Sequence, residues 1–239
     1  AWVSVPDAAA AMAQAAAAFY GDPTASMTAV GITGTNGKTT VSYLLEAAAS
    51  RAGRTVGVVG TTGHRLRGRF IEEATHTTPL SVDLMRLLAR MRQAGADFAA
   101  LEVSSHALAL KRADGVRFDA AILTNLHSDH LDFHGTREAY LETKARLFAL
   151  LERPDALKTR RTAVLNRDDP AYAAFRHRIL AVPCVSFGLS PEADYRADAV
   201  VLSQTATMFN LHAHGKRLSV RLKLLGEHNV MNALAAAAA

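Results

Sequence analysis

The sequence is poor in cysteine, in aromatic residues and in long apolar runs. Its single cysteine, Cys184, excludes a disulfide within the chain, and the surrounding PCVSF predicts a packing role on a buried strand. No apolar run approaches the roughly 20 residues of a membrane-spanning helix, so we expect no membrane span. The first residues, AWVSVPDAAAAMAQ, lack the basic stretch that opens a signal peptide. Together these absences predict a cytoplasmic protein.

Runs of positive charge are absent as well. The net charge of +5 suits nucleic acid, but it also suits a small substrate that carries several phosphates. The arginines between residues 51 and 92 are scattered, and aromatic residues make up only 6% of the chain. Nucleic-acid binding favours clustered basic residues with interleaved aromatics, so we expect no nucleic-acid partner.

Hydrophobic residues make up 49% of the 239 residues, which is enough for a sizeable core. Short apolar runs alternate with helical patterns, which predicts an α/β fold with a P-loop-type, mostly parallel sheet flanked by helices. After Asp194 the pattern changes to alternating segments, which predict a small antiparallel sheet. Strands are expected at 27–33, 55–59, 98–103, 118–123, 161–165, 182–187, 199–203, 207–212 and 218–224, helices at 38–52, 81–93 (capped by Ser81) and 136–151, and a hairpin or loop at 66–73.

Both ends of the sequence are expected to be cut points in a longer protein. The first 25 residues hold one alanine-rich helix and then Gly21-Asp22-Pro23, and the last residues stop within NALAAAAA, inside an expected helix. Alanine is a strong helix former, but an isolated alanine tract makes a poor domain edge. A natural alanine-rich tail is the alternative.

The stretch GITGTNGKTT, residues 31–40, lies between an apolar strand and a helical pattern. The common phosphate-binding loop, G-x-x-x-x-G-K-[ST], would need a glycine where Ile32 stands. Even so, backbone N–H groups from Gly34 to Thr39 can converge on phosphate oxygens at the helix N-terminus. Lys38 can reach the β and γ phosphates, and the Thr39 hydroxyl can hold Mg²⁺. The stretch therefore predicts a nucleotide site; a plain glycine-rich turn would not require Gly-Lys-Thr here.

Two further segments place ligand-type side chains after apolar runs. Glu102, in LEVSSHAL, lies near the carboxyl end of an expected strand, where α/β sheets place their ligand sites. A buried carboxylate there favours a metal or a cation, and a surface glutamate conflicts with the apolar run before it. The second segment, TNLHSDHLDFHG at residues 124–135, predicts contact with metal or phosphate through His127, Asp129, His130, Asp132 and His134.

Lys144 stands in the middle of an apolar helix face. On a helix over residues 140–151, spacings of three and four place it beside Tyr140, Leu147, Phe148 and Leu151. The ammonium group can snorkel to water along that face. Alternatively, burial lowers the lysine pKa, and the neutral amine adds CO₂ to become a carbamate that binds metal. The spacing leaves both readings open.

In chain order, these segments resemble the Mur ligase family over nearly the whole sequence. GTNGKTT is similar to the loop that Mur ligases share with the related folylpolyglutamate synthetases. The other matching segments are HTTP (76–79), EVSSHAL (102–108), TNLHSDHLDFHG (124–135), YLETK (140–144), LNRDD (165–169) and GEHNVMNALA (226–235). The set is most similar to the branch that adds an amino acid to UDP-MurNAc-L-Ala-D-Glu.

The resemblance implies an ATP-dependent amide ligase of peptidoglycan precursor synthesis. Residues 26–239 would be the central ATP-binding domain, and residues 1–25 the end of a UDP-binding N-terminal domain or its linker. The family's C-terminal ligase domain would be absent from this sequence. The D-glutamate carboxylate would become an acyl phosphate, and a diamino acid (lysine, meso-diaminopimelate or ornithine) would displace the phosphate. No protein nucleophile is required.

The resemblance also implies site residues. Catalysis would involve Lys38, Glu102, His130 and Lys144. The nucleotide would contact Gly34, Thr35, Asn36, Gly37, Lys38, Thr39 and Thr40, with Asn229 near the adenine. Two Mg²⁺ ions are implied, one on Thr39 and Glu102 and one on His130 and a carbamylated Lys144. The UDP-muramoyl dipeptide would contact Thr77, Thr78, Ser104 and Arg112.

Two positions depart from the family pattern. Leu110 stands where many members carry a substrate-binding glutamine, and GEHN at residues 226–229 replaces the more usual G-x-F-N and is closer to sister ligases. One alternative is therefore another Mur-type or folylpolyglutamate-type ligase, although the folate enzymes usually continue Gly-Lys-Gly-Ser. The other is a nucleotide-binding module without ligation, which the presence of Glu102 and Lys144 disfavours.

Overall fold

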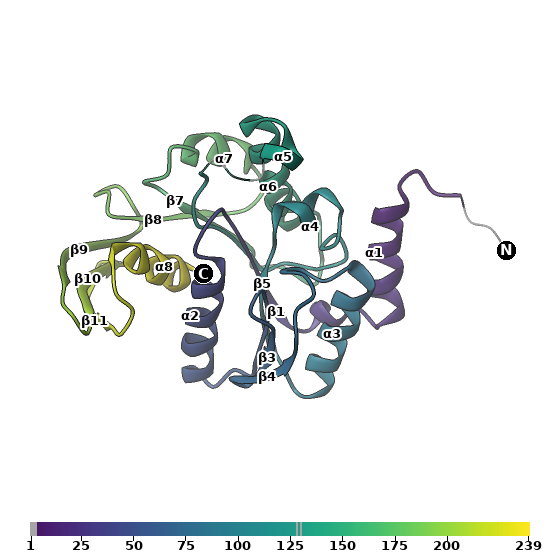
Figure 1. Ribbon diagram of the computed structural model, residues 1–239, viewed down its shortest axis with the longest axis horizontal. Helices are drawn as coiled ribbons and strands as arrows, with labels where there is room; N and C mark the ends of the chain where they lie inside the picture. Colours follow the sequence, from purple (N-terminus) through teal and green to yellow (C-terminus); the bar gives the residue numbers. More distant parts are fainter. Residues whose placement is uncertain (1–3, 128, 130) are drawn as a thin grey trace.

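One sheet of eleven strands runs through the computed structural model, which describes residues 4–127, 129 and 131–239. The strand order is β11-β10-β9-β8-β7-β6-β1-β5-β2-β3-β4 (Figure 1). The mostly parallel sheet is confirmed. Its central parallel strands are β1 (Thr28–Thr33), β2 (Val56–Val59), β5 (Phe98–Glu102), β6 (Ala120–Leu123), β7 (Thr162–Asn166) and β8 (Cys184–Gly188).

Helices cover both faces of the parallel strands, so these strands are buried on both sides and read as unbroken apolar runs. One core cluster joins the sheet to α3, α6 and the N-terminal α1, and the other joins it to α2 and α8. Among the helices described, none is long and apolar enough to cross a membrane. The helices that cover the two faces of the sheet are α1 (Ala8–Phe19), α2 (Lys38–Arg51), α3 (Ser81–Gln93), α6 (Arg137–Glu152) and α8 (Glu227–Ala238).

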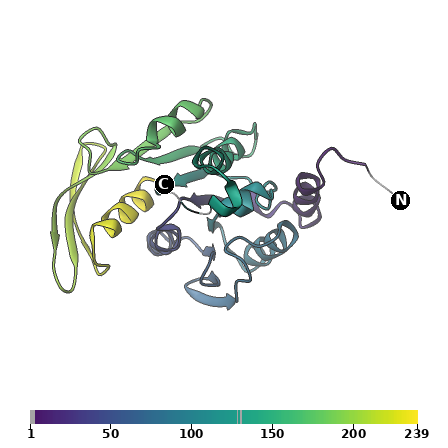
Figure 2. The same ribbon diagram turned by 45° about the horizontal axis from the view of Figure 1, so that its top comes forward.

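The antiparallel strands extend this same sheet and do not form a second one. Strand β8 pairs in parallel with β9 (Tyr195–Leu202), and β10 (Thr207–Ala213) and β11 (Lys216–Leu222) follow as antiparallel neighbours. Figure 2 shows α8 against one side of these three strands. Strand β9 begins four residues before the sequence predicts, because Ala199 has a φ of 50° beside a register shift, which interrupts the alternation.

Some local predictions need correction. Ser81 is not the N-cap of α3: Leu80 occupies that position with a ψ of 152°, no side chain caps the helix, and Ser81 is already its first residue. The hairpin expected at 66–73 is present, but it begins two residues earlier, with β3 (His64–Leu66) and β4 (Arg69–Glu72) as its strands. Short helical pieces that the sequence analysis did not predict are η1 (Pro23–Ala25), α4 (Ser105–Ala109), α5 (Leu131–His134) and α7 (Tyr172–Arg178).

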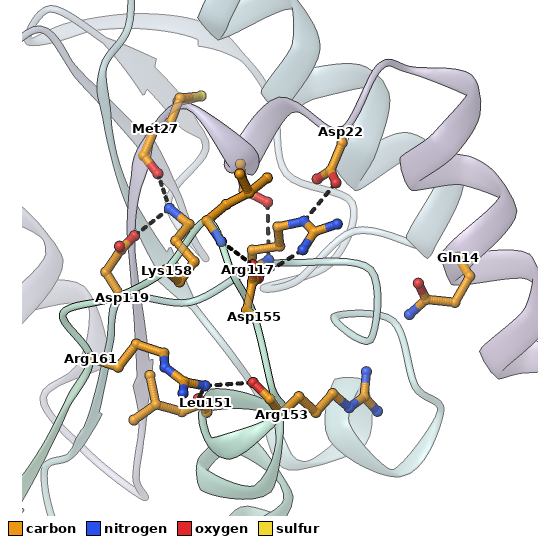
Figure 3. A network of polar contacts seen from close by, with 12 residues as sticks. Gln14, Asp22, Met27, Arg117, Asp119, Leu151, Arg153, Asp155, Lys158 and Arg161 are labelled. Carbon is orange, nitrogen blue, oxygen red and sulfur yellow. Dashed lines mark hydrogen bonds and ion pairs between the residues drawn. The ribbon is translucent and has the colours of Figure 1, made fainter. Parts of the chain in front are cut away.

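At the amino end of β1, a network of ion pairs joins the segment after α1 to the sheet (Figure 3). The Arg117 guanidinium donates to Asp22 at 2.6 Å and to Asp155 at 2.8 Å. Lys158 is 5% exposed, and its Nζ lies 2.6 Å from both Asp119 Oδ2 and the Met27 carbonyl. Each of these buried or half-buried cations has a carboxylate partner, so the positive charges at this end of the strand are neutralised within the fold.

Candidate active site

The loop between β1 and α2 is built around two glycines that other residues could not replace. Gly34 has a φ of 141°, and a Cβ there would lie 1.9 Å from the Thr124 hydroxyl oxygen. Gly37, the N-cap of α2, has a φ of 88°, and a Cβ there would lie 2.3 Å from Asn232 Oδ1. The loop therefore brings bare backbone to the positive end of α2, as a phosphate cradle requires.

Lys38 folds back over this loop. Its Nζ donates to the carbonyl oxygens of Gly34 and Thr35, both at 2.9 Å. Burial lowers the pKa of Lys38, and the carboxylates of Glu102 and Asp129 act in the opposite direction. The ammonium group thus lies at the mouth of the cradle, where anionic phosphate oxygens would replace backbone carbonyls as its partners.

Glu102 ends β5 and is buried beside the cradle. Its Oε2 accepts a hydrogen bond from the Thr39 hydroxyl at 2.9 Å, so the fold brings the two predicted magnesium ligands together. Burial raises the pKa of Glu102, and hydrogen bonds from Thr39 and Thr61 offset part of that rise. The hydroxyl oxygen of Thr39 and the carboxylate oxygens of Glu102 are of the type that Mg²⁺ prefers.

Thr61 is a site residue that the sequence analysis missed. It follows β2, and both its backbone N–H and its hydroxyl donate to Glu102, at 3.2 and 3.0 Å. Its hydroxyl also lies 3.1 Å from that of Thr77. The position of GTTG directly after an apolar strand was the only available signal, since nothing in that motif specifies a carboxylate partner.

Lys144 does not reach water. It is 1% exposed on α6, and its Nζ donates to the Gly34 carbonyl at 3.0 Å and lies 4.5 Å from the centre of the Tyr140 ring. Burial, aided by the positive charge of Lys38, lowers the pKa of Lys144 to about 7. The nitrogen therefore has a substantial neutral fraction near neutral pH and lies beside the cradle.

The histidine-rich loop after β6 is described only in part. His127 exchanges hydrogen bonds with Thr35: its N–H donates to Thr35 Oγ1 at 3.0 Å, and its carbonyl accepts from that hydroxyl at 3.1 Å. His130, the predicted second-metal residue, lies outside the described residues. Within the described part of the chain, no three His, Cys, Asp or Glu side chains form a metal-binding group. A first ion would instead depend on the pair Thr39 and Glu102.

Of the four residues predicted to hold the muramoyl peptide, Thr78, Ser104 and Arg112 are joined by hydrogen bonds at the carboxyl end of β5, and Thr77 lies beside Thr61. Thr78 is buried, and its hydroxyl donates to the Glu102 carbonyl at 2.8 Å and accepts from the Ser104 N–H at 3.1 Å. Ser104 caps α4 through Ala107. These two hydroxyls are thus engaged within the fold. Arg112 donates to the Thr78 carbonyl at 3.1 Å, while its buried Nε has no hydrogen-bond partner among the described residues.

A pocket of about 350 Å³ adjoins the cradle, between the loops after β1, β6 and β7 and the start of α8. Asn229, predicted near the adenine, does not line it. Its amide nitrogen donates to the Leu225 carbonyl at 2.9 Å and lies 3.1 Å from His228 Nε2, while its oxygen accepts from Asn232 at 3.1 Å. The α8 residues that do line the pocket are His228, Met231 and Asn232.

Comparison with known proteins gives one consistent result. The family model described as the Mur ligase middle domain matches residues 32–239. A UDP-N-acetylmuramoyl-L-alanyl-D-glutamate–2,6-diaminopimelate ligase of Geobacter metallireducens is 48% identical over 238 residues, which are 100% of this chain and 46% of that protein. The chain thus spans about half the length of such curated relatives.

Solved structures agree. A structure of a UDP-N-acetylmuramoyl-L-alanyl-D-glutamate–2,6-diaminopimelate ligase superposes with a TM-score of 0.86 at 33% identity, covering 98% of this chain and 47% of that one. Mycobacterium tuberculosis folylpolyglutamate synthase complexed with ADP gives a TM-score of 0.78 at 20% identity, covering 97% of this chain and 57% of that one. At that identity the second match shows the shared fold alone.

Proposed function

The chain belongs to the Mur ligase family, and we propose that it is the ATP-binding part of a UDP-N-acetylmuramoyl-tripeptide synthetase. In this proposal, residues 26–239 form the ATP-binding domain and residues 1–25 join it to a UDP-binding domain. The whole enzyme, placed in the cytoplasm, adds 2,6-diaminopimelate to UDP-MurNAc-L-Ala-D-Glu. The names of the relatives favour diaminopimelate over lysine and ornithine.

One observation carries the proposal: Lys38, Lys144 and the Thr39–Glu102 pair converge on a single glycine cradle. A carboxylate and a triphosphate repel each other, so their meeting requires concentrated positive charge. ATP supplies the phosphoryl group that turns the carboxylate into an acyl phosphate, with release of ADP. The amino group of the added amino acid then attacks the acyl carbon, forms the amide and displaces phosphate. Residues Gly34 to Thr40 hold the triphosphate, and Lys38 neutralises its β and γ groups.

The residues present fit a magnesium site. Thr39 and Glu102 would hold one Mg²⁺, and His130 with a carbamylated Lys144 would hold a second, so that the ions offset phosphate charge. For the carbamate, the neutral amine of Lys144 forms a bond to CO₂ and releases one proton. A buried amine whose pKa is about 7 suits that reaction.

On the acceptor side, Thr77 and Arg112 would bind the muramoyl peptide directly. Thr78 and Ser104 would contribute mainly by shaping the loop, since their hydroxyls already have partners. The adenine would lie in the pocket beside the cradle, and Asn229 would support it there by fixing His228 and Asn232.

The test is phosphate release from ATP by the whole, full-length enzyme, given UDP-MurNAc-L-Ala-D-Glu and diaminopimelate, lysine or ornithine in turn. We expect release that requires both the dipeptide and diaminopimelate, and none from Lys38→Ala, which should also lose MgATP binding in calorimetry. Release with a different acceptor would move the protein to a sister branch. Undiminished MgATP binding by Lys38→Ala would contradict the cradle assignment.

A further inference from the structure

Tyr140 contacts several parts of the nucleotide site but is not among its predicted catalytic or binding residues. It lies in the first turns of α6, four residues before Lys144, and is 1% exposed. A tyrosine buried to that extent usually finds a partner for its hydroxyl. The identity of that partner shows what the side chain does.

The Tyr140 hydroxyl lies 3.2 Å from Thr35 Oγ1 in the phosphate-binding loop. The Thr35 hydroxyl proton is committed to the carbonyl of His127, at 3.1 Å, and its oxygen accepts from the N–H of His127 at 3.0 Å. Tyr140 must therefore be the donor to the second lone pair of Thr35. These three hydrogen bonds exhaust the capacity of one hydroxyl group.

The ring of Tyr140 contacts a different partner. Lys144 Nζ lies 4.5 Å from the ring centre, on its way to the Gly34 carbonyl. Tyr140 therefore contacts two residues of the site. One is Thr35, which joins the loop after β1 to the loop after β6, and the other is Lys144 of α6. The hydroxyl and the ring of Tyr140 have separate tasks, which makes them separable by substitution.

We propose that Tyr140 is a positioning residue whose hydroxyl, acting through Thr35, holds the phosphate-binding loop in the form that accepts MgATP. Thr35 is fixed from two sides, by the backbone of His127 and by Tyr140. Removing the tyrosine hydroxyl leaves an unsatisfied lone pair on Thr35 in a half-buried setting and lets residues 34–36 move. The proposal rests on the nucleotide site of the proposed function and adds a residue to its support.

The test is a double-mutant cycle on MgATP affinity, measured by calorimetry in the full chain with Tyr140→Phe, Thr35→Val and both together. Tyr140→Phe keeps the ring over Lys144 and should weaken MgATP binding about threefold to tenfold, the range for one buried hydrogen bond. In the Thr35→Val background the same change should have no further effect. Thr35→Ser retains the hydroxyl and should bind nearly as the wild type does.

Tyr195→Phe is the matched control, since its hydroxyl bonds to His214 at 2.8 Å on the antiparallel strands, away from the cradle. It should leave MgATP affinity unchanged. Wild-type affinity in Tyr140→Phe would overturn the proposal, as would an equal loss with and without the Thr35 hydroxyl. If Tyr140→Phe does not fold, equal affinity in Thr35→Val and Thr35→Ser overturns it. A wild-type protein that binds no MgATP would instead overturn the nucleotide site itself.

Discussion

Two buried lysines lie at opposite ends of β1, and the fold treats them differently. At the amino end, Lys158 donates to the Met27 carbonyl and forms an ion pair with Asp119 at 2.6 Å (Figure 3). At the carboxyl end, Lys144 donates to the Gly34 carbonyl, and in the described part of the chain it forms no ion pair. The two side chains are comparably buried, at 5% and 1% exposure.

Under the proposed function, the difference is that between a structural charge and one kept for chemistry. A buried ammonium group is costly unless a carboxylate neutralises it, so pairing is expected wherever folding alone is at stake. For Lys144, burial and the nearby positive charge of Lys38 lower the pKa to about 7, although the Asp129 carboxylate acts in the opposite direction. Perturbed groups of this kind cluster at functional sites, where the unfavourable burial serves chemistry.

The largest expected effect is on activity. Lys144→Ala in the full chain should lower the rate of phosphate release by about 10² to 10³-fold, as loss of one charge-stabilising group does. A short-chain carboxylic acid should restore part of the rate by replacing the carbamate. Full activity without the added acid would make Lys144 a structural residue, like Lys158.

The second effect is on stability. Lys158→Met strands the Asp119 carboxylate and should lower the free energy of unfolding by about 3 kcal/mol, at the low end for a broken buried pair because Asp119 is partly exposed. Lys144→Met is the matched control, and near neutral pH it should not destabilise the fold. Urea unfolding measures the free energy of unfolding of both variants. Equal losses in the two variants would contradict the contrast between the two lysines.

The smallest effect is on pH dependence. The pKa of Lys144 is lowered from 10.5 to about 7, so above pH 7 the unfolded state binds more protons than the folded state. Wild-type stability should therefore rise with pH, by about 1 kcal/mol between pH 7 and 8, relative to Lys144→Met in CO₂-free buffer. Parallel stability curves for the two proteins would show that Lys144 does not titrate in this range.

The cradle was predictable from the sequence because strand, glycine turn and Lys38 follow one another locally. The position of Lys144 on the inner face of α6 was predictable from helical spacing, but not that it forms no ion pair with any residue that the structure describes. Pairing depends on which loops meet at each end of β1, and that is settled by the sheet order. For the same reason the sequence did not connect Thr61 with Glu102, which are 41 residues apart.

Predictions failed where local geometry departs from the regular pattern. The helix of residues 81–93 begins without a side-chain cap, so the serine that suggested a cap was misleading. The first part of β9 was not predicted, because the positive φ of Ala199 interrupts the alternating pattern of the strand. The place of Asn229 near the adenine stays a prediction; the contacts of its amide with Leu225, His228 and Asn232 depend on side-chain packing and could not be foreseen.

The contrast between the two lysines is tested most directly by ¹³C NMR of the full chain in ¹³C-labelled bicarbonate. We predict a carbamate signal in the wild type that disappears in Lys144→Met and persists in Lys158→Met under conditions where that variant is folded. A wild-type protein without this signal, or a signal that survives in Lys144→Met, would contradict the claim that Lys144, beside the cradle, is kept for chemistry.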